Sequence, residues 1–242
     1  MVSFNGKEVL HLVFATLALA FIFAFDDGRP TFILSLWLLN FFRMALICAA
    51  VLLSYVIAQK IIAERYGCST EFRMWSLQRY GFRPYSKFKR PMPIGALVGI
   101  IVAFLSSGKL FFAAAGSFEV VEHRYRRVGR KYINITAMEL AKIALSGVLA
   151  SLLLAYVMAA LGFKEFVLVA TLFSVFQMIP LPNLDGIKVF FASLPFFAFS
   201  AAFVLVSTIL LNLVSASTAL FFSFIAAGVF FIMFFYYRTY SS

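Results

Sequence analysis

A single carboxylate, Asp185, follows a proline break in a strongly apolar part of the chain, within the stretch Ile179-Pro180-Leu181-Pro182-Asn183-Leu184-Asp185-Gly186. An acid at membrane depth is energetically costly, and this position therefore indicates a functional site. Two structural alternatives stay open. Asp185 or Asn183 caps the helix that follows, or Asp185 forms an ion pair with Lys188.

The apolar segment before the break, Phe166 to Ile179, has about 14 residues and gives roughly 21 Å of helix. Pro180 and Pro182 stop that helix, so the break falls inside the membrane or at its inner edge. Unwound backbone at that depth is tolerated only where protein or a cavity covers it. We therefore expect a binding groove formed by Gln177, Pro180, Pro182, Asn183 and Asp185.

The two histidines of the chain are the first candidates for metal ligands. His11 follows Glu8 by three residues, and such a pair shares one helix face, but two ligands alone make a weak site. The alternative for His11 is an interfacial group that titrates near neutral pH. His123 lies in a charged loop, where we expect it to be solvated.

The two cysteines, Cys48 and Cys68, are 20 residues apart, and this spacing favours neither a zinc ribbon nor a disulfide framework. We expect two unpaired thiols. A site assembled from His11, Cys68 and Asp185 remains an alternative, but the residues as a whole predict no metal site.

Composition defines the class of protein. The chain has 242 residues, of which 63% are hydrophobic and 13% charged, and several runs reach the roughly 20 apolar residues that a membrane helix needs. The runs are apolar on every face, which excludes the alternating pattern of a β-barrel. We predict one polytopic all-α membrane domain over residues 1–242, with the lipid bilayer as its surroundings. The first apolar run is a retained span rather than a cleaved signal.

The first span is expected from about Val9 to Phe25, and the second apolar run extends from Thr31 to Ala63. At 1.5 Å per residue the second run is about 48 Å long, too long for one upright crossing. We place Arg43 and Lys60 near opposite membrane surfaces, where their stems can snorkel. The residues before Arg43 then extend beyond the membrane or lie along its outer face.

Two basic loops, residues 60–92 and 116–132, are expected in the cytoplasm, because Lys and Arg near span ends stay inside. The apolar segment 93–115 joins these loops, and a single crossing would separate them, so we predict a re-entrant element or hairpin there. The remaining runs give about six spans in all, with both termini cytoplasmic in a cell membrane. The net charge of +11 follows from this topology and does not indicate nucleic-acid binding.

The stretch from Gln177 to Gly186 resembles the motif N-x-x-P-x-P-x-x-D-G of the site-2 protease family of intramembrane zinc metalloproteases. In that family the aspartate, here Asp185, is the third zinc ligand. Gln177 replaces the usual asparagine. The resemblance covers roughly residues 50 to 190 and implies an archaeal type of source.

A second stretch, Ser54 to Gly67, resembles the zinc-binding helix of archaeal members, where H-E-x-x-H is followed by a lysine and an A-E-R-Y-G-like ending. The ending is present as Ala63 to Gly67. Tyr55 and Gln59 replace the two histidines and Val56 replaces the glutamate. A third, weaker likeness, Lys142 to Ser151, is similar to the family's A-G-P-x-x-N segment.

The substitutions remove the family's chemistry. In H-E-x-x-H, two imidazoles on one helix face bind zinc while the glutamate handles the proton of the bound water. Val56 can neither accept nor donate a proton, and Gln59 and a neutral Tyr55 are poor zinc ligands. No catalytic residue and no metal ligand set are therefore predicted, although Asp185 is retained.

Three functions remain in competition. The first is a non-proteolytic relative of site-2 proteases that binds a transmembrane or extended client segment, as an adaptor or as a subunit of a membrane complex. The second is an active zinc metalloprotease with a shifted metal site, which would be a metalloendopeptidase. The third is a channel or transporter that uses Asp185 and Arg43.

Overall fold

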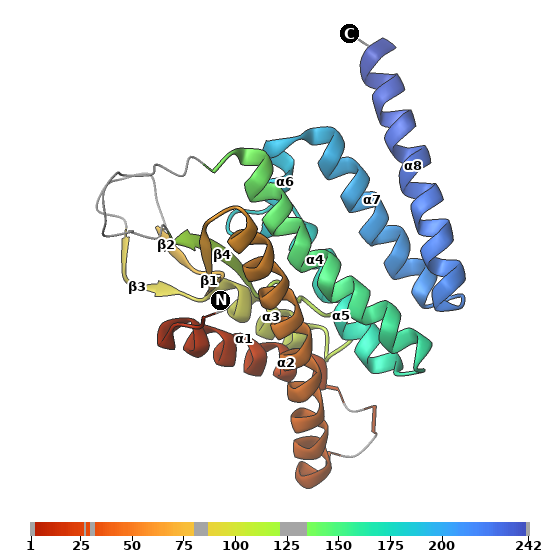
Figure 1. Cartoon of the computed structure of the whole chain (residues 1–242). Helices are drawn as coiled ribbons and strands as arrows, with labels where there is room; N and C mark the ends of the chain where they lie inside the picture. The colour runs from red at the N-terminus through yellow and green to blue at the C-terminus, as the bar shows by residue number, and fades with distance from the viewer. Residues whose placement is uncertain (1–2, 27, 30–31, 80–86, 122–134, 241–242) are drawn as a thin grey trace.

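The computed structural model describes residues 3–26, 28–29, 32–79, 87–121 and 135–240. The helices within these ranges are α1 (Gly6–Ala24), α2 (Leu34–Arg65), α3 (Ile94–Leu105), α4 (Ala137–Ala160), α5 (Lys164–Met178), α6 (Asp185–Ala192), α7 (Leu194–Leu211) and α8 (Ala216–Tyr240). The strands are β1 (Ser69–Met74), β2 (Leu77–Arg79), β3 (Lys87–Met92) and β4 (Gly116–Val121). Figure 1 shows α4 in the middle of the helices and the strands gathered at one end of α2.

Five helices, α1, α2, α4, α7 and α8, are long and apolar enough to cross a membrane. This confirms a predominantly helical chain with several candidate membrane spans. The predicted span 166–179 corresponds to α5, which has 15 residues and ends at the proline break. The count of six spans stays a prediction.

Helix α2 is continuous over 32 residues, because no proline or glycine interrupts its sequence. It ends where Gly67 adopts a left-handed backbone conformation, with a φ of 73°, just beyond the helix. Its first turns project past the neighbouring helices (Figure 1), and Leu34 and Leu39 are exposed there. Arg43 forms an ion pair with Glu165 at the start of α5, so both residues lie at the same end of the bundle.

The strands correct the all-α prediction. β1 pairs antiparallel with β4, with Phe72 opposite Phe118, and β2 pairs antiparallel with β3. In β1 the buried residues Thr70 and Phe72 alternate with more exposed ones, the period of a half-buried strand. The many cations of the loop concealed this alternation in the sequence. The β1–β4 ribbon also joins the two basic loops, which supports their placement on one side of the membrane.

The segment 93–115, predicted as a re-entrant element or hairpin, consists of α3, a turn, and a returning segment without regular secondary structure. A Cβ added at Gly95 would lie 2.5 Å from the carbonyl oxygen of Ala114, and one at Gly99 would lie 2.9 Å from that of Phe112. The helix and the returning chain are therefore in direct contact. The turn between them brings Gly108 against Asp26, beyond the end of α1.

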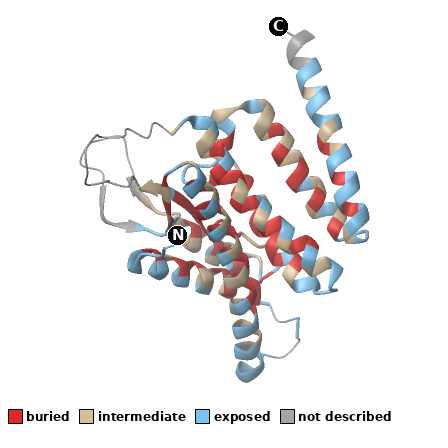
Figure 2. Cartoon of the chain, viewed as in Figure 1, coloured by how far each residue is buried: buried red, intermediate tan, exposed pale blue. Residues whose placement is uncertain are grey.

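The buried side chains concentrate where α2, α4 and α5 meet the ribbon, and α8 is largely exposed (Figure 2). Helix α4 begins with a capping box, in which Thr136 and Glu139 each accept a hydrogen bond from the other's backbone N–H. It packs against α2, α5 and α6. This arrangement encloses the first turn of α6, where Asp185 and Gly186 are buried.

Candidate functional site

Asp185 is the first residue of α6 and is completely buried. The residue that precedes the helix is Leu184, and no side chain caps it. The amide of Asn183 donates to the carbonyl oxygen of Ser76 instead, at 3.3 Å. The alternative in which Asp185 or Asn183 serves as a helix cap is therefore wrong, and the Asp185 carboxylate points into the protein interior.

Two side chains of α2 meet this carboxylate. The Tyr55 hydroxyl donates to Oδ2 of Asp185, and Nε2 of Gln59 donates to the same oxygen at 2.6 Å. Tyr55 and Gln59 are four residues apart, so they project from one face of the helix. Both are essentially inaccessible to solvent. Residues about 130 positions apart in the chain thus form one buried hydrogen-bonded cluster.

The other carboxylate oxygen faces β4 and α6. The hydroxyl of Ser117 donates to Oδ1 of Asp185, and the Lys188 ammonium lies 3.4 Å from that oxygen. Lys188 also donates to the Ser117 hydroxyl and, at 2.7 Å, to the carbonyl oxygen of Phe118. Its nitrogen lies 3.4 Å from the centroid of the Phe118 ring, a cation–π distance. The predicted Asp185–Lys188 pair is therefore present.

Burial lowers the pKa of the Lys188 ammonium from its usual 10.5, while the charges of Asp185 and Glu119 act in the opposite direction. Lys188 keeps a 17% exposed side chain, whereas Asp185 has none. The cluster therefore combines the fully buried Asp185 carboxylate with the Lys188 side chain, which remains partly exposed at the edge of the cluster.

Two glycines allow the helices to close around the cluster. A Cβ at Gly147 of α4 would lie 2.7 Å from both Nε2 of Gln59 and a ring carbon of Tyr55. A Cβ at Gly186 would collide with the backbone carbonyl of Met178 across the proline break. A larger residue at Gly147 would push α4 away from Tyr55 and Gln59, and one at Gly186 would push α6 away from the end of α5.

Gln177 at the end of α5 extends the polar region along β4. Its Nε2 donates to the carbonyl oxygen of Gly116 at 2.8 Å. Among the described residues, the side-chain oxygens of Gln59 and Gln177 are buried without a hydrogen-bond partner, and each such acceptor costs about 1–3 kcal/mol. This region therefore has unused capacity to accept hydrogen bonds.

The five residues of the predicted groove separate into two groups. Gln177 and Asp185 are buried in the interior, whereas Pro180, Pro182 and Asn183 lie exposed on the turn that joins α5 to α6. The left-handed backbone of Asn183, with a φ of 63°, helps to form this turn. The turn thus presents an accessible surface directly above the buried carboxylate.

Glu8 is a second buried acid, and its pairing with Lys60 was not predicted from the sequence. Glu8 of α1 is 1% exposed and lies 2.9 Å from the ammonium of Lys60, which is 8% exposed. Glu8 also accepts from the backbone N–H of Phe72 at 3.0 Å, and Lys60 donates to the carbonyl oxygens of Thr70 and Ser3. The expectation that the Lys60 stem snorkels to the membrane surface is therefore replaced by a buried ion pair. The sequence feature that could have indicated this pair is a lysine in the last turns of a long apolar helix.

The candidate metal ligands identified in the sequence do not gather into one site among the described residues. Within the described ranges no three His, Cys, Asp or Glu side chains lie close enough to hold a metal ion. Glu8 pairs with Lys60 rather than acting with His11. Cys48 and Cys68 are free thiols, as predicted. His123 lies outside the described residues.

The chemistry of the Asp185 cluster is that of a carboxylate surrounded by donors. Tyr55, Gln59, Ser117 and Lys188 direct hydrogens at its two oxygens. Zinc in proteins is bound by imidazole, thiolate or carboxylate groups, and among the described residues of this cluster Asp185 alone carries one of these groups. Val56, between the two α2 donors, is 2% exposed and has no polar atom in its side chain. The residues present do not fit a zinc ion.

No protein-family model matches the chain, and no curated protein or solved structure matches it either.

Proposed function

We propose that this protein is a non-proteolytic, site-2-protease-like integral membrane protein that binds a client segment as an adaptor or as a subunit of a membrane complex. The observation that carries the proposal is that Tyr55 and Gln59 both donate to one oxygen of Asp185. These are the three positions that the sequence resemblance equates with zinc ligands. Hydrogen-bond donors of the protein therefore occupy the carboxylate oxygen that a metal would have to bind.

The position that should supply a general base supports the same proposal. A metalloprotease needs a group that takes a proton from the attacking water. The position that the resemblance assigns to this group is Val56. Ser117 and Lys188 are hydrogen-bonded to each other and to Asp185. Neither of them is therefore free to activate water while the cluster is intact.

The client surface that we propose is the α5–α6 turn and the adjoining outer edge of β4. Pro180, Pro182 and Asn183 are exposed on this turn. Gln177 and Lys188 bond the carbonyl oxygens of Gly116 and Phe118 along that edge. Gly116, Ser117 and Phe118 are buried, so an extended client must first displace Gln177 and Lys188, after which it can form backbone bonds of its own with β4, the usual way in which a strand is recognised.

Site-specific crosslinking in native membranes tests the proposal. A photoreactive residue at Asn183 should capture client proteins and recover them at full length. The same residue at Leu213, which is 74% exposed in the turn between α7 and α8, is the matched control and should capture few of them. Recovery of cleaved clients, with cleavage stopped by a chelator, would favour the alternative of an active metalloprotease with a shifted site.

A further inference from the structure

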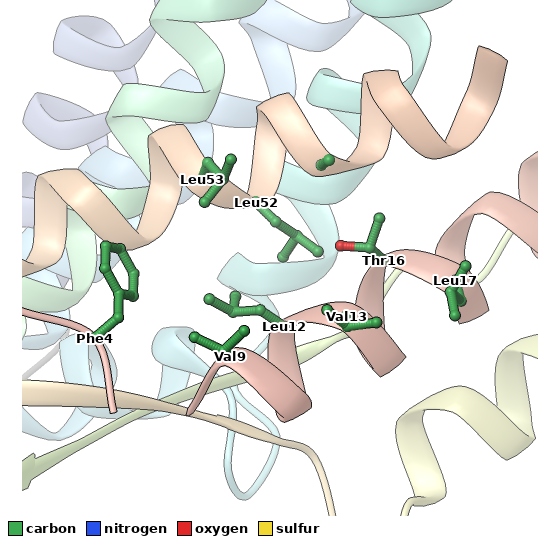
Figure 3. A pocket seen from close by; sticks show the side chains of 9 residues that line it. Phe4, Val9, Leu12, Val13, Thr16, Leu17, Leu52 and Leu53 are labelled. Carbon is green, nitrogen blue, oxygen red and sulfur yellow. The ribbon is translucent and has the colours of Figure 1, made fainter. Parts of the chain in front are cut away.

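A groove with a volume of about 400 Å³ lies between α1 and α2, and none of its lining residues belongs to the Asp185 cluster. Val9, Val13 and Leu17 line it from α1, and Ala49 and Leu53 line it from α2. Figure 3 shows Val9 and Val13 on one side of the space between the two helices and Leu53 on the other. We propose that this groove holds one hydrocarbon chain of a membrane lipid.

The position of the groove determines which medium fills it. α1 and α2 are both long and apolar enough to span a membrane. The residues at the mouth of the groove, Val9, Val13 and Leu53, are 44–49% exposed. In a bilayer these exposed apolar positions face hydrocarbon rather than water, so lipid chains have direct access to the groove.

The dimensions of the groove favour a chain over a helix. From Val9 to Leu17 the α1 axis rises about 12 Å, so the groove volume corresponds to a mean cross-section of roughly 30 Å². A helix about 10 Å across needs roughly 80 Å². A single extended hydrocarbon chain is thin enough to enter, whereas a client helix or a helix of a second copy is not.

The polarity of the walls excludes a polar ligand and recognition of a headgroup. Among the described residues that line the groove, Thr16 is the one with a polar side chain. Phe4 also lines the groove, and the Lys60 ammonium lies 4.8 Å from the centroid of its ring. That ammonium already donates to Glu8, Ser3 and Thr70. The groove therefore recognises the lipid by its hydrocarbon alone, and headgroup type should not alter occupancy.

The test uses the full chain in nanodiscs made from a phospholipid with a photoreactive diazirine in one acyl chain. Adducts should concentrate on residues 9–17 and 49–53 relative to Ile232 of α8, which is 67% exposed. The distribution should be the same for anionic and zwitterionic headgroups. Adducts spread evenly over all exposed apolar faces, or crosslinks that join α1 to a second copy of the chain, would overturn the proposal.

Substitutions inside and outside the groove provide a second test. Ala49→Phe fills the groove and should reduce groove adducts about tenfold, the factor that corresponds to about 1.4 kcal/mol of binding free energy. Leu46→Phe, at a 74% exposed position of α2 outside the groove, should leave them unchanged. If Ala49→Phe does not fold, Val13→Trp obstructs the mouth at a position with open space. Undiminished groove adducts in a folded variant would contradict the assignment.

Discussion

The β1–β4 ribbon carries an acid–lysine pair at each edge, and the two pairs differ in construction. At β1, Glu8 and Lys60 lie 2.9 Å apart and bond the backbone of Phe72 and Thr70. At β4, Asp185 and Lys188 lie 3.4 Å apart. There the acid takes its bonds from side chains, and only the lysine reaches the strand backbone.

This difference indicates that the Glu8–Lys60 pair has a structural role, whereas the Asp185 cluster has the properties of a site. The charges of the Glu8–Lys60 pair satisfy each other and the strand, so no alternative partner is available to either. The Asp185 cluster instead consists of adjustable groups, namely hydroxyls that rotate and amides that can turn over. It also retains the two buried amide oxygens without partners. We therefore expect a substitution in the Glu8–Lys60 pair to cost more stability than one in the Asp185 cluster, where the remaining side chains can form new hydrogen bonds.

The largest expected effect is at the β1 edge. Glu8→Gln keeps an oxygen for Phe72 but leaves the Lys60 ammonium buried without a counter-charge. Removing one partner of such a pair costs about 3–5 kcal/mol, which denaturant unfolding in detergent micelles would measure. The double variant Glu8→Gln with Lys60→Met should recover most of this loss. A loss below about 1 kcal/mol, the value for a surface pair, would show that the pair is not effectively buried.

At the Asp185 cluster, Tyr55→Phe removes one hydrogen bond to a buried anion, an interaction worth about 1.5–3 kcal/mol. Tyr156→Phe is the control, because that buried hydroxyl makes a 3.4 Å bond to the uncharged Ser223 and should cost about 0.5–1.5 kcal/mol. The same unfolding measurement applies to both variants. Equal losses would indicate that the Asp185 carboxylate is not ionised in this cluster.

Asp185→Asn should be milder than Glu8→Gln, at about 1–2 kcal/mol. The new amide group can donate to the free oxygen of Gln59 once that side chain turns over. Lys188 also keeps its bonds to Ser117 and Phe118. A loss as large as that of Glu8→Gln would remove the distinction between the rigid pair and the adjustable cluster.

The smallest effect expected is a pH dependence. Because burial lowers the pKa of Lys188 below 10.5, the unfolded chain binds more protons than the folded one between the lowered pKa and 10.5. Stability contributed by this group therefore rises with pH across that window. Lys188→Met should flatten the rise in unfolding curves collected at several alkaline pH values. An unchanged slope in Lys188→Met would assign the rise to other groups.

Much of the helical framework could be predicted, because a run of apolar residues in a membrane must satisfy its backbone internally as helix. The expected span from Val9 to Phe25 corresponds closely to α1 (Gly6–Ala24). The ribbon could not be predicted. Its strands are more than 40 residues apart in the chain, and pairing between such distant segments leaves little local trace.

The site was predictable only in part. Asp185 and Gln177 were identified from the proline break, and Tyr55 and Gln59 from the family resemblance. Ser117 was missed, because its position beside Asp185 depends on the register of β4 against β1. Lys60 was assigned to the membrane surface by its charge, whereas contacts from α1 and β1 keep it buried.

The most direct test is the zinc content of the purified chain, measured by inductively coupled plasma mass spectrometry. We expect far less than one zinc ion per chain, and no difference between the unmodified protein and Asp185→Ala. The triple variant Tyr55→His, Val56→Glu, Gln59→His restores two imidazoles beside Asp185 and should acquire zinc. One zinc ion per unmodified chain, lost in Asp185→Ala, would contradict the account.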